Sequence, residues 1–330
     1  ARRPRQPALL IAGSISVRVE VVGAGVVGLS VACRLLEDGH EVVVRAAAGG
    51  GATTSAVAAA LWYPYLAAPE VDTRRWGRHT YEVLRTIAAH SPDAGVDMRR
   101  GYEYAPAATQ TPRWSADVDG FDRDFTGWSF VSPVADMSRY LPWLTARVTS
   151  LGGQVHLDHT IRPTDWQPGG LLGGGADAVV LATGLGSRSL LDDQQLHPVR
   201  GQVVLLEQPG VDEWYLDSTD EQAPVYVVPR RSVVVCGGTA LDDRWDTEPD
   251  PATSEAILRR CVERVPALAG ARVVDARVGL RPVRPTVRLG RLDGLGAATP
   301  VVACYGHGGA GVTLSWGCAD EVGGIIDALA

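Results

Sequence analysis

The fold is decided by the stretch VRVEVVGAGVVGLSVACRLLEDGHEVVVR, which spans residues 17–45. It begins with VRVEVV, Val17 to Val22, a segment rich in β-branched residues that predicts a strand. Apolar residues then recur at helical spacing from Val27 to Leu35, and Gly39 stands where a helix commonly ends. The run from Glu41 to Arg45 predicts a second strand. Together these pieces form a βαβ unit.

The turn of this unit carries the spacing GxGxxG. Gly23 allows a tight turn, Gly25 lets a phosphate approach the backbone, and Gly28 lets the helix pack closely on the strand. Phosphates would then meet the free N–H groups at the start of the helix. A plain strand-to-helix turn is the alternative. We predict a dinucleotide site formed by Gly23, Ala24, Gly25, Val26, Val27 and Gly28.

Arg45 ends the second strand, at a position where an acidic residue commonly binds a ribose. An arginine there can instead accept a 2′-phosphate, which keeps an NADP-dependent dehydrogenase as a rival interpretation. The alternative is that Arg45 is a solvated strand end.

A second glycine-rich turn lies near the C-terminus. The sequence predicts a strand from Val301 to Cys304, a loop from Tyr305 to Gly311 and a helix from Val312 to Leu329. Donors at the start of that helix can stabilise negative charge on a reduced flavin, a device that a nicotinamide does not need. Together with the first βαβ unit, this loop favours FAD.

The middle of the chain is richer in strands, with helical spacing at 70–90 and in the run from Met137 to Leu151. A helix from Ser254 to Val265 would be capped by Thr253 or Ser254, and a strand from Ala271 would end at Leu280. We predict an α/β fold with a Rossmann-like FAD-binding domain and a β-rich substrate domain. The expected division is a disordered leader at 1–16, a discontinuous FAD-binding domain at 17–62, 135–195 and 280–330, and a substrate domain at 63–134 and 196–279.

Composition excludes several classes of function. The chain has 31 arginines and no lysine, which excludes Schiff-base and P-loop lysine chemistry. The net charge of −7 argues against nucleic acid, and no apolar run is long enough for a membrane helix. The five cysteines form no CxxC pair, so we expect buried reduced thiols, no metal site and a cytoplasmic protein.

Arg281 is the strongest single candidate for binding substrate. It stands between Leu280 and Pro282, and a guanidinium can hold a carboxylate through two hydrogen bonds. A structural ion pair is the alternative, and Arg284 is the other possible carrier of this role. Tyr226 can donate a second hydrogen bond, although a tyrosine in a strand is more often part of the core. His307 is either a base or a residue that holds the backbone.

These motifs resemble the D-amino-acid oxidase family, FAD flavoproteins that include D-aspartate oxidase. The similar stretches are VVGAGVVGLS (21–30), TTSAVAAALWYPYL (53–66), MSRYLPWLTARV (137–148), ADAVVLATGLGS (176–187), RGQVV (200–204), VYVVP (225–229), GLRPVRPTVRL (279–289) and YGHGGAGVTLSWG (305–317).

The resemblance implies a role for each matching residue. Arg281 would pair with the substrate carboxylate, Tyr226 would assist it, and the Gly309 carbonyl would accept a hydrogen bond from the substrate amine. The remaining residues expected at FAD are Arg45, Thr53, Thr54, Ser55, Ala60, Leu61, Trp62, Ile161, Thr183, Gly184, Gly308, Gly309, Ala310, Gly311, Val312 and Thr313. The family's second active-site tyrosine has no counterpart in the segment 217–222, which predicts a shorter or more open lid.

The implied reaction is oxidative deamination of a neutral or apolar D-amino acid, by direct hydride transfer from its α-carbon to flavin N5. Its products are a 2-oxo acid, ammonia and hydrogen peroxide. The expected partners are a D-amino acid and O₂, without nucleic acid or membrane, and a homodimer is left open. The alternatives are a D-aspartate oxidase, a flavin dehydrogenase with another electron acceptor, and the NADP-dependent dehydrogenase.

Overall fold

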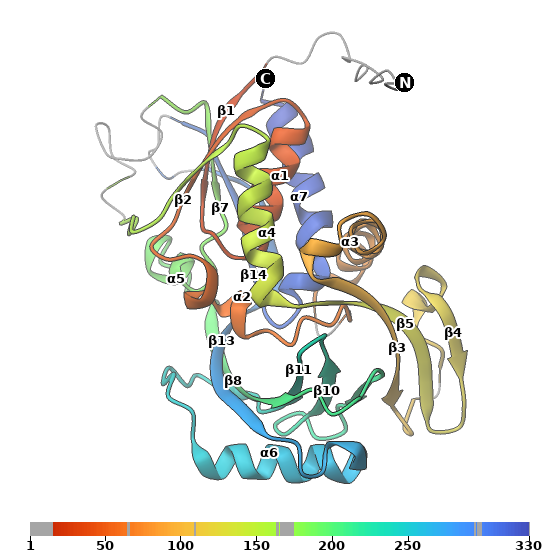
Figure 1. Cartoon of the computed structure of the whole chain (residues 1–330). Coiled ribbons are helices and arrows are strands. Elements are labelled where there is room, and N and C mark those ends of the chain that lie inside the picture. Colours follow the sequence, from red (N-terminus) through yellow and green to blue (C-terminus); the bar gives the residue numbers. More distant parts are fainter. Residues whose placement is uncertain are drawn as a thin grey trace, which may run out of the picture.

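The predicted βαβ unit forms the centre of a parallel sheet in the computed structural model (Figure 1). The structure describes residues 16–64, 67–108, 110–162, 165, 175–293, 295 and 299–329. Of the predicted leader, only Ser16 lies within these ranges. The parallel strands, in spatial order, are β14 (Val301–His307), β7 (Ala178–Leu181), β1 (Arg18–Val22), β2 (Glu41–Arg45) and β6 (Gln154–His156).

Three helices pack side by side on one face of these strands: α1 (Val26–Glu37), α4 (Met137–Ser150) and α7 (Gly311–Asp327) (Figure 1). Apolar side chains at helical spacing bury Leu29, Leu35 and Leu144 in the main core between helices and sheet. The helix α3 (Glu70–His90) lies against α7, in agreement with the predicted helix at 70–90. Since the two glycine turns begin α1 and α7, this packing brings the starts of both helices to the same edge of the sheet.

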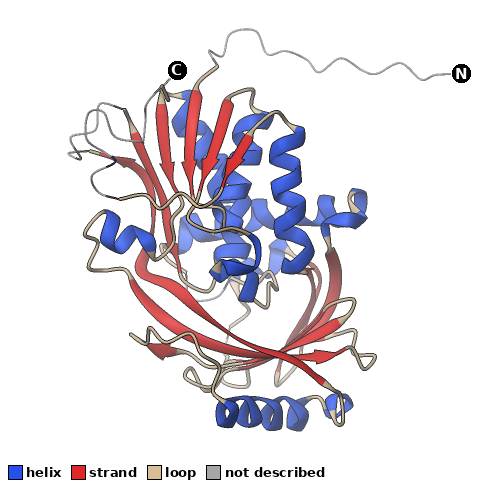
Figure 2. Ribbon diagram, turned by 60° about the vertical axis from the view of Figure 1, so that its left-hand side comes forward, coloured by secondary structure: helices blue, strands red, loops and turns tan. Residues whose placement is uncertain are grey.

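The other half of the molecule is a mostly antiparallel sheet, with α6 (Pro251–Arg264) lying across it (Figure 2). Its strands are β3 (Val96–Tyr104), β4 (Asp119–Arg123), β5 (Gly127–Ala135), β8 (His197–Glu207), β9 (Trp214–Asp217), β10 (Val225–Pro229), β11 (Val233–Gly237) and β12 (Leu241–Asp242). The short helices are α2 (Thr54–Val57), α5 (Gly186–Leu190) and the 3₁₀ turns Gly50–Ala52, Pro92–Ala94, Arg113–Asp117 and Pro266–Leu268. A second core between α6 and this sheet contains Val227, Val234 and Ile257.

One long strand, β13 (Val273–Leu292), joins the two halves. Its first part pairs with β8, and its last part pairs with β14 after a shift of register between Val283 and Arg288. The expectation that the strand ends at Leu280 is wrong, because Pro282 is accommodated opposite Pro198 in β8. Arg281 therefore lies within a continuous strand, and the predicted domain boundary at 280 falls inside it. The division into domains stays a prediction.

Two other sequence-based boundaries are also wrong. The helix α6 begins three residues earlier than expected, at Pro251, because the side chain of Asp250 caps it by accepting a hydrogen bond from the backbone N–H of Thr253 at 2.8 Å. Residues 305–307 belong to β14 rather than to the glycine loop. The cysteines agree with prediction, since all five are buried free thiols.

No helix in the described part of the chain is both long enough and apolar enough to cross a membrane.

Candidate cofactor and substrate site

A cavity of about 910 Å³ lies where the two halves of the molecule meet. Its wall runs from the first glycine turn, at Gly23, to Tyr226 on β10 and Arg281 on β13. The starts of α1 and α7 both reach this wall, and the N-terminus of a helix favours negative charge. A single cavity therefore combines two anion-binding ends of helices with an arginine and a tyrosine.

The first glycine turn is packed too tightly for any larger residue. A β-carbon added to Gly23 would lie 2.3 Å from the Ala182 carbonyl oxygen, and one added to Gly28 would lie 2.0 Å from the Gly23 carbonyl oxygen. Gly23 also has a positive φ of 120°. The hydroxyl of Ser55 accepts a hydrogen bond from the backbone N–H of Val26 at 3.0 Å, which ties the loop 53–55 to the start of α1. These contacts fit a backbone cradle for a pyrophosphate.

All the residues predicted at the cofactor line this cavity except Gly28, Arg45, Trp62, Ala310 and Thr313. Gly28 packs inside the turn. The Trp62 indole is buried and donates to the Gly77 carbonyl at 2.9 Å. Ala310 is buried at the start of α7, and the Thr313 hydroxyl donates to the Tyr63 carbonyl at 2.9 Å. Their part in binding FAD stays a prediction.

The partner of Arg45 is a carboxylate of the protein rather than the 2′-phosphate that its position suggested. Its guanidinium forms an ion pair with the buried Glu20 on the neighbouring strand, with 2.7 Å between Nε and Oε1. The side chain is neither a simple solvated strand end nor part of the cavity wall. The sequence could not reveal this pair, because it depends on the parallel register that sets Arg45 beside β1.

The segment Ala58–Leu61 forms another part of the wall, and Arg230 holds it in place. Nη2 of this buried arginine donates to the carbonyl oxygens of Ala58 at 2.6 Å and Ala59 at 3.3 Å. Burial lowers the pKa of Arg230 to about 10, against the opposing effect of Asp136. Ala60 has a positive φ of 60°, so the segment is fixed in an unusual conformation. Sequence analysis missed this contact, because it joins residues 171 and 172 positions apart.

The second glycine turn lies on the wall at Gly308, Gly309 and Gly311. Gly308 has a positive φ of 55°, and its N–H donates to the Pro282 carbonyl at 2.8 Å. This bond ties the turn to β13, one residue beyond Arg281. The cavity size, the two glycine-rich turns and the two helix starts fit FAD, which would be held by these turns and by the segment Ala58–Leu61.

Arg281 and Tyr226 lie together on the cavity wall. Nη1 of Arg281 donates to the Thr239 carbonyl at 2.9 Å, and Nη2 donates to the Tyr226 hydroxyl at 3.5 Å. Among the described residues, no carboxylate lies within ion-pair distance of Arg281. Burial raises the pKa of the Tyr226 phenol while the charge of Arg281 opposes that shift, so the phenol keeps its proton and can donate it to a bound anion.

Arg284, the other candidate, already has a carboxylate. Its Nε lies 2.9 Å from Asp193, which also accepts a hydrogen bond from the Tyr305 hydroxyl at 2.8 Å. Burial opposes ionisation of Asp193, but the hydrogen bonds from Tyr305 and Arg284 outweigh it and lower the pKa of the carboxyl. Of the two arginines, Arg281 is therefore the one available to a ligand.

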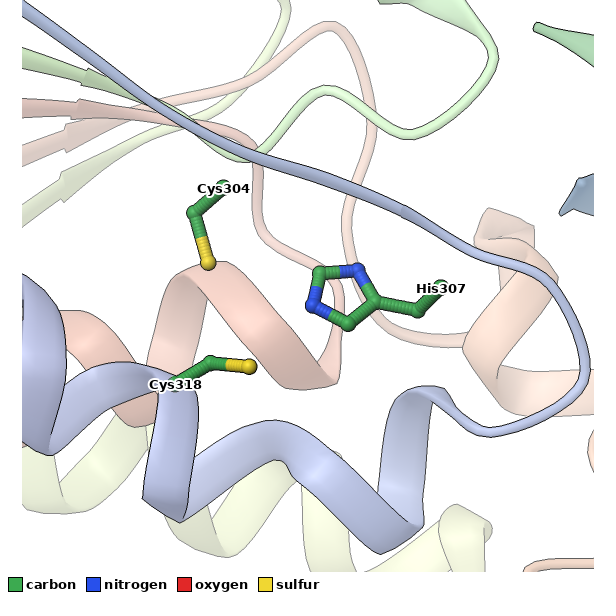
Figure 3. A group of neighbouring side chains, drawn as sticks. All are labelled: Cys304, His307 and Cys318. Carbon is green, nitrogen blue, oxygen red and sulfur yellow. The ribbon is translucent and has the colours of Figure 1, made fainter. Parts of the chain in front are cut away.

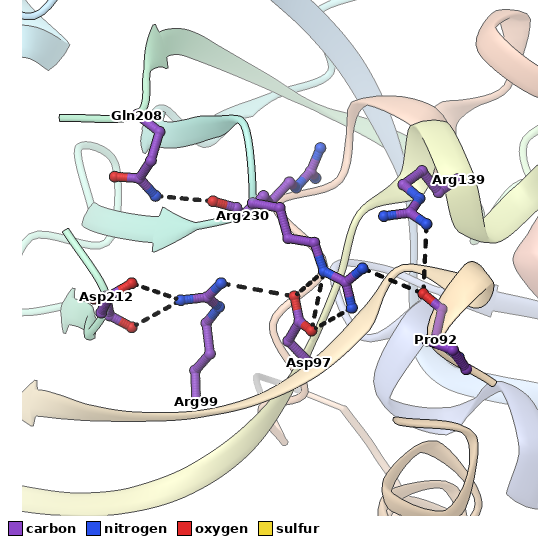
Figure 4. Close-up of polar contacts among 8 residues, drawn as sticks. Pro92, Asp97, Arg99, Arg139, Gln208, Asp212 and Arg230 are labelled. Carbon is purple, nitrogen blue, oxygen red and sulfur yellow. Dashed lines mark hydrogen bonds and ion pairs between the residues drawn. The ribbon is translucent and has the colours of Figure 1, made fainter. Parts of the chain in front are cut away.

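The outer wall beside Tyr226 contains Leu216, Val228, Ser218 and Glu221. The arginines nearest in sequence are engaged elsewhere: Arg230 holds the segment described above, and Arg231 pairs with Asp97 at 2.8 Å. Arg99 likewise lies between Asp97 and Asp212 (Figure 4). Glu221 adds a negative charge to the wall, which disfavours a second carboxylate on a ligand.

Comparison with known proteins places this chain in a family. The family model described as FAD dependent oxidoreductase matches residues 18–324. A D-amino-acid oxidase of Rubrobacter xylanophilus is 45% identical over 326 residues, which cover 96% of this chain and 98% of that protein. A human D-aspartate oxidase is 35% identical over 330 residues, with 94% of each protein covered.

The solved structures agree on the fold. Glycine oxidase from Bacillus cereus superposes with a TM-score of 0.73 at 20% identity, over 95% of each chain. The family, the fold class, the FAD cofactor and the oxidoreductase class predicted from the sequence are all confirmed. The chain belongs to the family of FAD dependent oxidoreductases.

Proposed function

We propose that this protein oxidises neutral and apolar D-amino acids, with O₂ as the final electron acceptor. The observation that carries the proposal is the pair Arg281 and Tyr226, in which the guanidinium has no carboxylate partner among the described residues and lies beside a protonated phenol. An amino-acid carboxylate between them would complete the hydrogen bonds that the pair offers. The D-amino-acid oxidase of Rubrobacter xylanophilus supports the reaction, since the chains align over nearly their full lengths.

The protein's own part in this reaction is to orient the substrate. Arg281 and Tyr226 would hold the carboxylate, and the Gly309 carbonyl would accept a hydrogen bond from the amine. Two fixed ends leave the α-carbon in one orientation, and positioning of this kind can contribute about 7–11 kcal/mol to lowering a barrier. FAD, when bound, supplies the two-electron oxidation. The substrate then leaves as an imine, which water hydrolyses to a 2-oxo acid and ammonia, while O₂ is reduced to hydrogen peroxide.

The preference for neutral and apolar side chains rests on the outer wall. Leu216 and Val228 offer apolar contact there, and Glu221 would repel an acidic side chain. Arg230 and Arg231, which could otherwise receive a second carboxylate, are engaged with backbone carbonyls and with Asp97. Because the chain is also similar to a human D-aspartate oxidase, an acidic D-amino acid is the second candidate substrate.

Anaerobic mixing with D-alanine and L-alanine tests the reaction. We expect the yellow flavin absorbance to bleach with D-alanine alone, and to return with hydrogen peroxide when O₂ is admitted. Bleaching by the L-enantiomer would contradict the proposed stereochemistry. Recovery only with an artificial acceptor would identify a dehydrogenase instead, and faster bleaching by D-aspartate than by D-alanine would favour the second candidate.

The cytoplasmic location, the absence of nucleic-acid partners and a homodimer remain proposals from the sequence. Cell fractionation tests the location, and sedimentation of the purified protein tests the homodimer.

A further inference from the structure

Three side chains with metal-binding atoms meet beside the second glycine turn. Cys304 and His307 lie on β14, and Cys318 lies on α7 (Figure 3). Their ligand atoms all lie within 4.8 Å of one another, and all three residues are buried. Figure 3 shows the sulfur atoms approaching from two different elements, with one edge of the imidazole ring turned toward them.

His307 provides a second and independent observation. Its Nε2 is buried and has no hydrogen-bond partner in the part of the chain that the structure describes, and the residue as a whole is only 5% exposed. Buried polar atoms nearly always have a partner, so an atom of this kind asks for an explanation. A metal ion between the imidazole and the two sulfur atoms would supply the missing partner.

The chemistry of the three donors limits the kind of ion. Two thiolates and an imidazole are soft or borderline ligands, which suit Zn²⁺ and similar ions and do not suit Mg²⁺ or Ca²⁺. Two thiolates also balance the charge of a divalent ion, which matters at a buried position. The charge of Glu321 on α7 acts on both thiols, but its carboxylate is already engaged by Arg75 and by the Trp76 indole.

The large cavity offers an ion a path to this cluster. Cys304 and His307 line the large cavity, whereas Cys318 lies behind them and is not part of its wall. An ion held by all three would therefore keep one side toward the cavity. Zinc sites with three protein ligands commonly hold a water or another small ligand in the fourth position.

We propose that Cys304, His307 and Cys318 form a binding site for a thiophilic divalent cation of the Zn²⁺ type, with its fourth coordination position facing the cavity. The sequence predicted no metal site, because the ligands at 304, 307 and 318 match none of the familiar zinc spacings. Only the packing of α7 against β14 brings Cys318 to the other two. The proposal does not depend on the substrate or on the reaction.

The test uses the full chain with its FAD, produced in medium supplemented with Zn²⁺ and purified under reducing conditions. Elemental analysis should give about one zinc per chain for the native sequence. We expect Cys318→Ser to lose most of that zinc. Cys236→Ser replaces a buried thiol on β11, outside the cluster, and should keep it. Native protein without zinc, or equal zinc in both variants, would overturn the site.

X-ray absorption at the zinc edge of the native protein covers the case in which Cys318→Ser does not fold. We expect two sulfur ligands at about 2.3 Å and a histidine nitrogen at about 2.0 Å. A shell made only of oxygen and nitrogen would show adventitious binding at surface histidines and carboxylates, and would overturn the proposal.

Discussion

Arg281 and Tyr226 lie 3.5 Å apart on the cavity wall, with the phenol oxygen accepting a hydrogen bond from guanidinium Nη2. Because the oxygen is used as an acceptor, the phenol proton stays free to be donated outward. The guanidinium is in turn held by the Thr239 carbonyl at 2.9 Å. Both side chains are thereby oriented before any substrate arrives, which reduces the entropy lost on binding.

Replacing Arg281 tests the substrate anchor. A charge-assisted hydrogen bond contributes about 1.5–3 kcal/mol, so we expect Arg281→Ala to lower kcat/KM for D-alanine by roughly 10- to 150-fold. The flavin spectrum should be retained, since the glycine turns remain intact. Arg231→Ala is the matched control, because this arginine is bound to Asp97 and should be dispensable for activity. Equal kinetics for the native protein and Arg281→Ala would remove the proposed anchor.

Replacing Gly201 is a subtler test, because the substitution leaves the Arg281 guanidinium and the Tyr226 hydroxyl in the protein. A β-carbon at this position would lie 2.4 Å from Nη2 of Arg281, which is the flexible end of a long side chain. We therefore expect Gly201→Ala to fold while displacing the guanidinium, with KM for D-alanine raised about tenfold, or roughly 1.4 kcal/mol. Gly210→Ala is a control for adding a methyl group, since no atom of the described residues lies within 4 Å of the added β-carbon, although the positive φ of Gly210 costs some stability. A Gly201→Ala variant with native KM would show that the position of the guanidinium matters little.

Arg230 allows the segment Ala58–Leu61 to be loosened without touching the cavity wall. Arg230→Met removes the hydrogen bonds to Ala58 and Ala59 and leaves the carboxylate of Asp136 without its ion-pair partner at 3.7 Å. Removing one partner of a buried ion pair commonly costs about 3–5 kcal/mol of folding free energy, so we expect a clear loss of stability. FAD affinity should fall as well, measured by fluorescence titration. A destabilised protein with unchanged FAD affinity would mean that this segment does not contact the cofactor.

The sequence carried much of the fold, for physical reasons that differ from element to element. The βαβ unit at 17–45 is encoded by local patterns of apolar residues and glycines, and the structure contains it as predicted. The strand β13 was predicted too short, because a proline commonly ends a strand, whereas here Pro282 lies opposite Pro198 of β8, just before the strand changes partner to β14. The Arg281 anchor was suggested by its motif, whereas the pairing of Arg284 with Asp193 spans 91 positions and needed the folded chain.

Glu103 gives a prediction about pH. Burial raises the pKa of its carboxyl from 4.5 to about 7, although hydrogen bonds from the Tyr63 hydroxyl and the Trp128 indole, both at 2.6 Å, act against the rise. Between these two values the folded protein keeps a proton that the unfolded chain has released. Stability must therefore fall as pH rises from about 4.5 to about 7 and stay at the lower level above that, by up to about 3 kcal/mol.

Glu103→Gln isolates this contribution, because its amide oxygen can still accept from Tyr63 and Trp128 but cannot ionise. We expect the native protein to become less stable relative to this variant as the pH rises from 5 to 8. Urea unfolding at several pH values measures it, and taking the difference cancels the other titrating groups. Glu213→Gln, the same substitution at an exposed position, is the matched control. A constant difference for Glu103→Gln would mean that the carboxyl is ionised throughout, despite its burial beside Trp128.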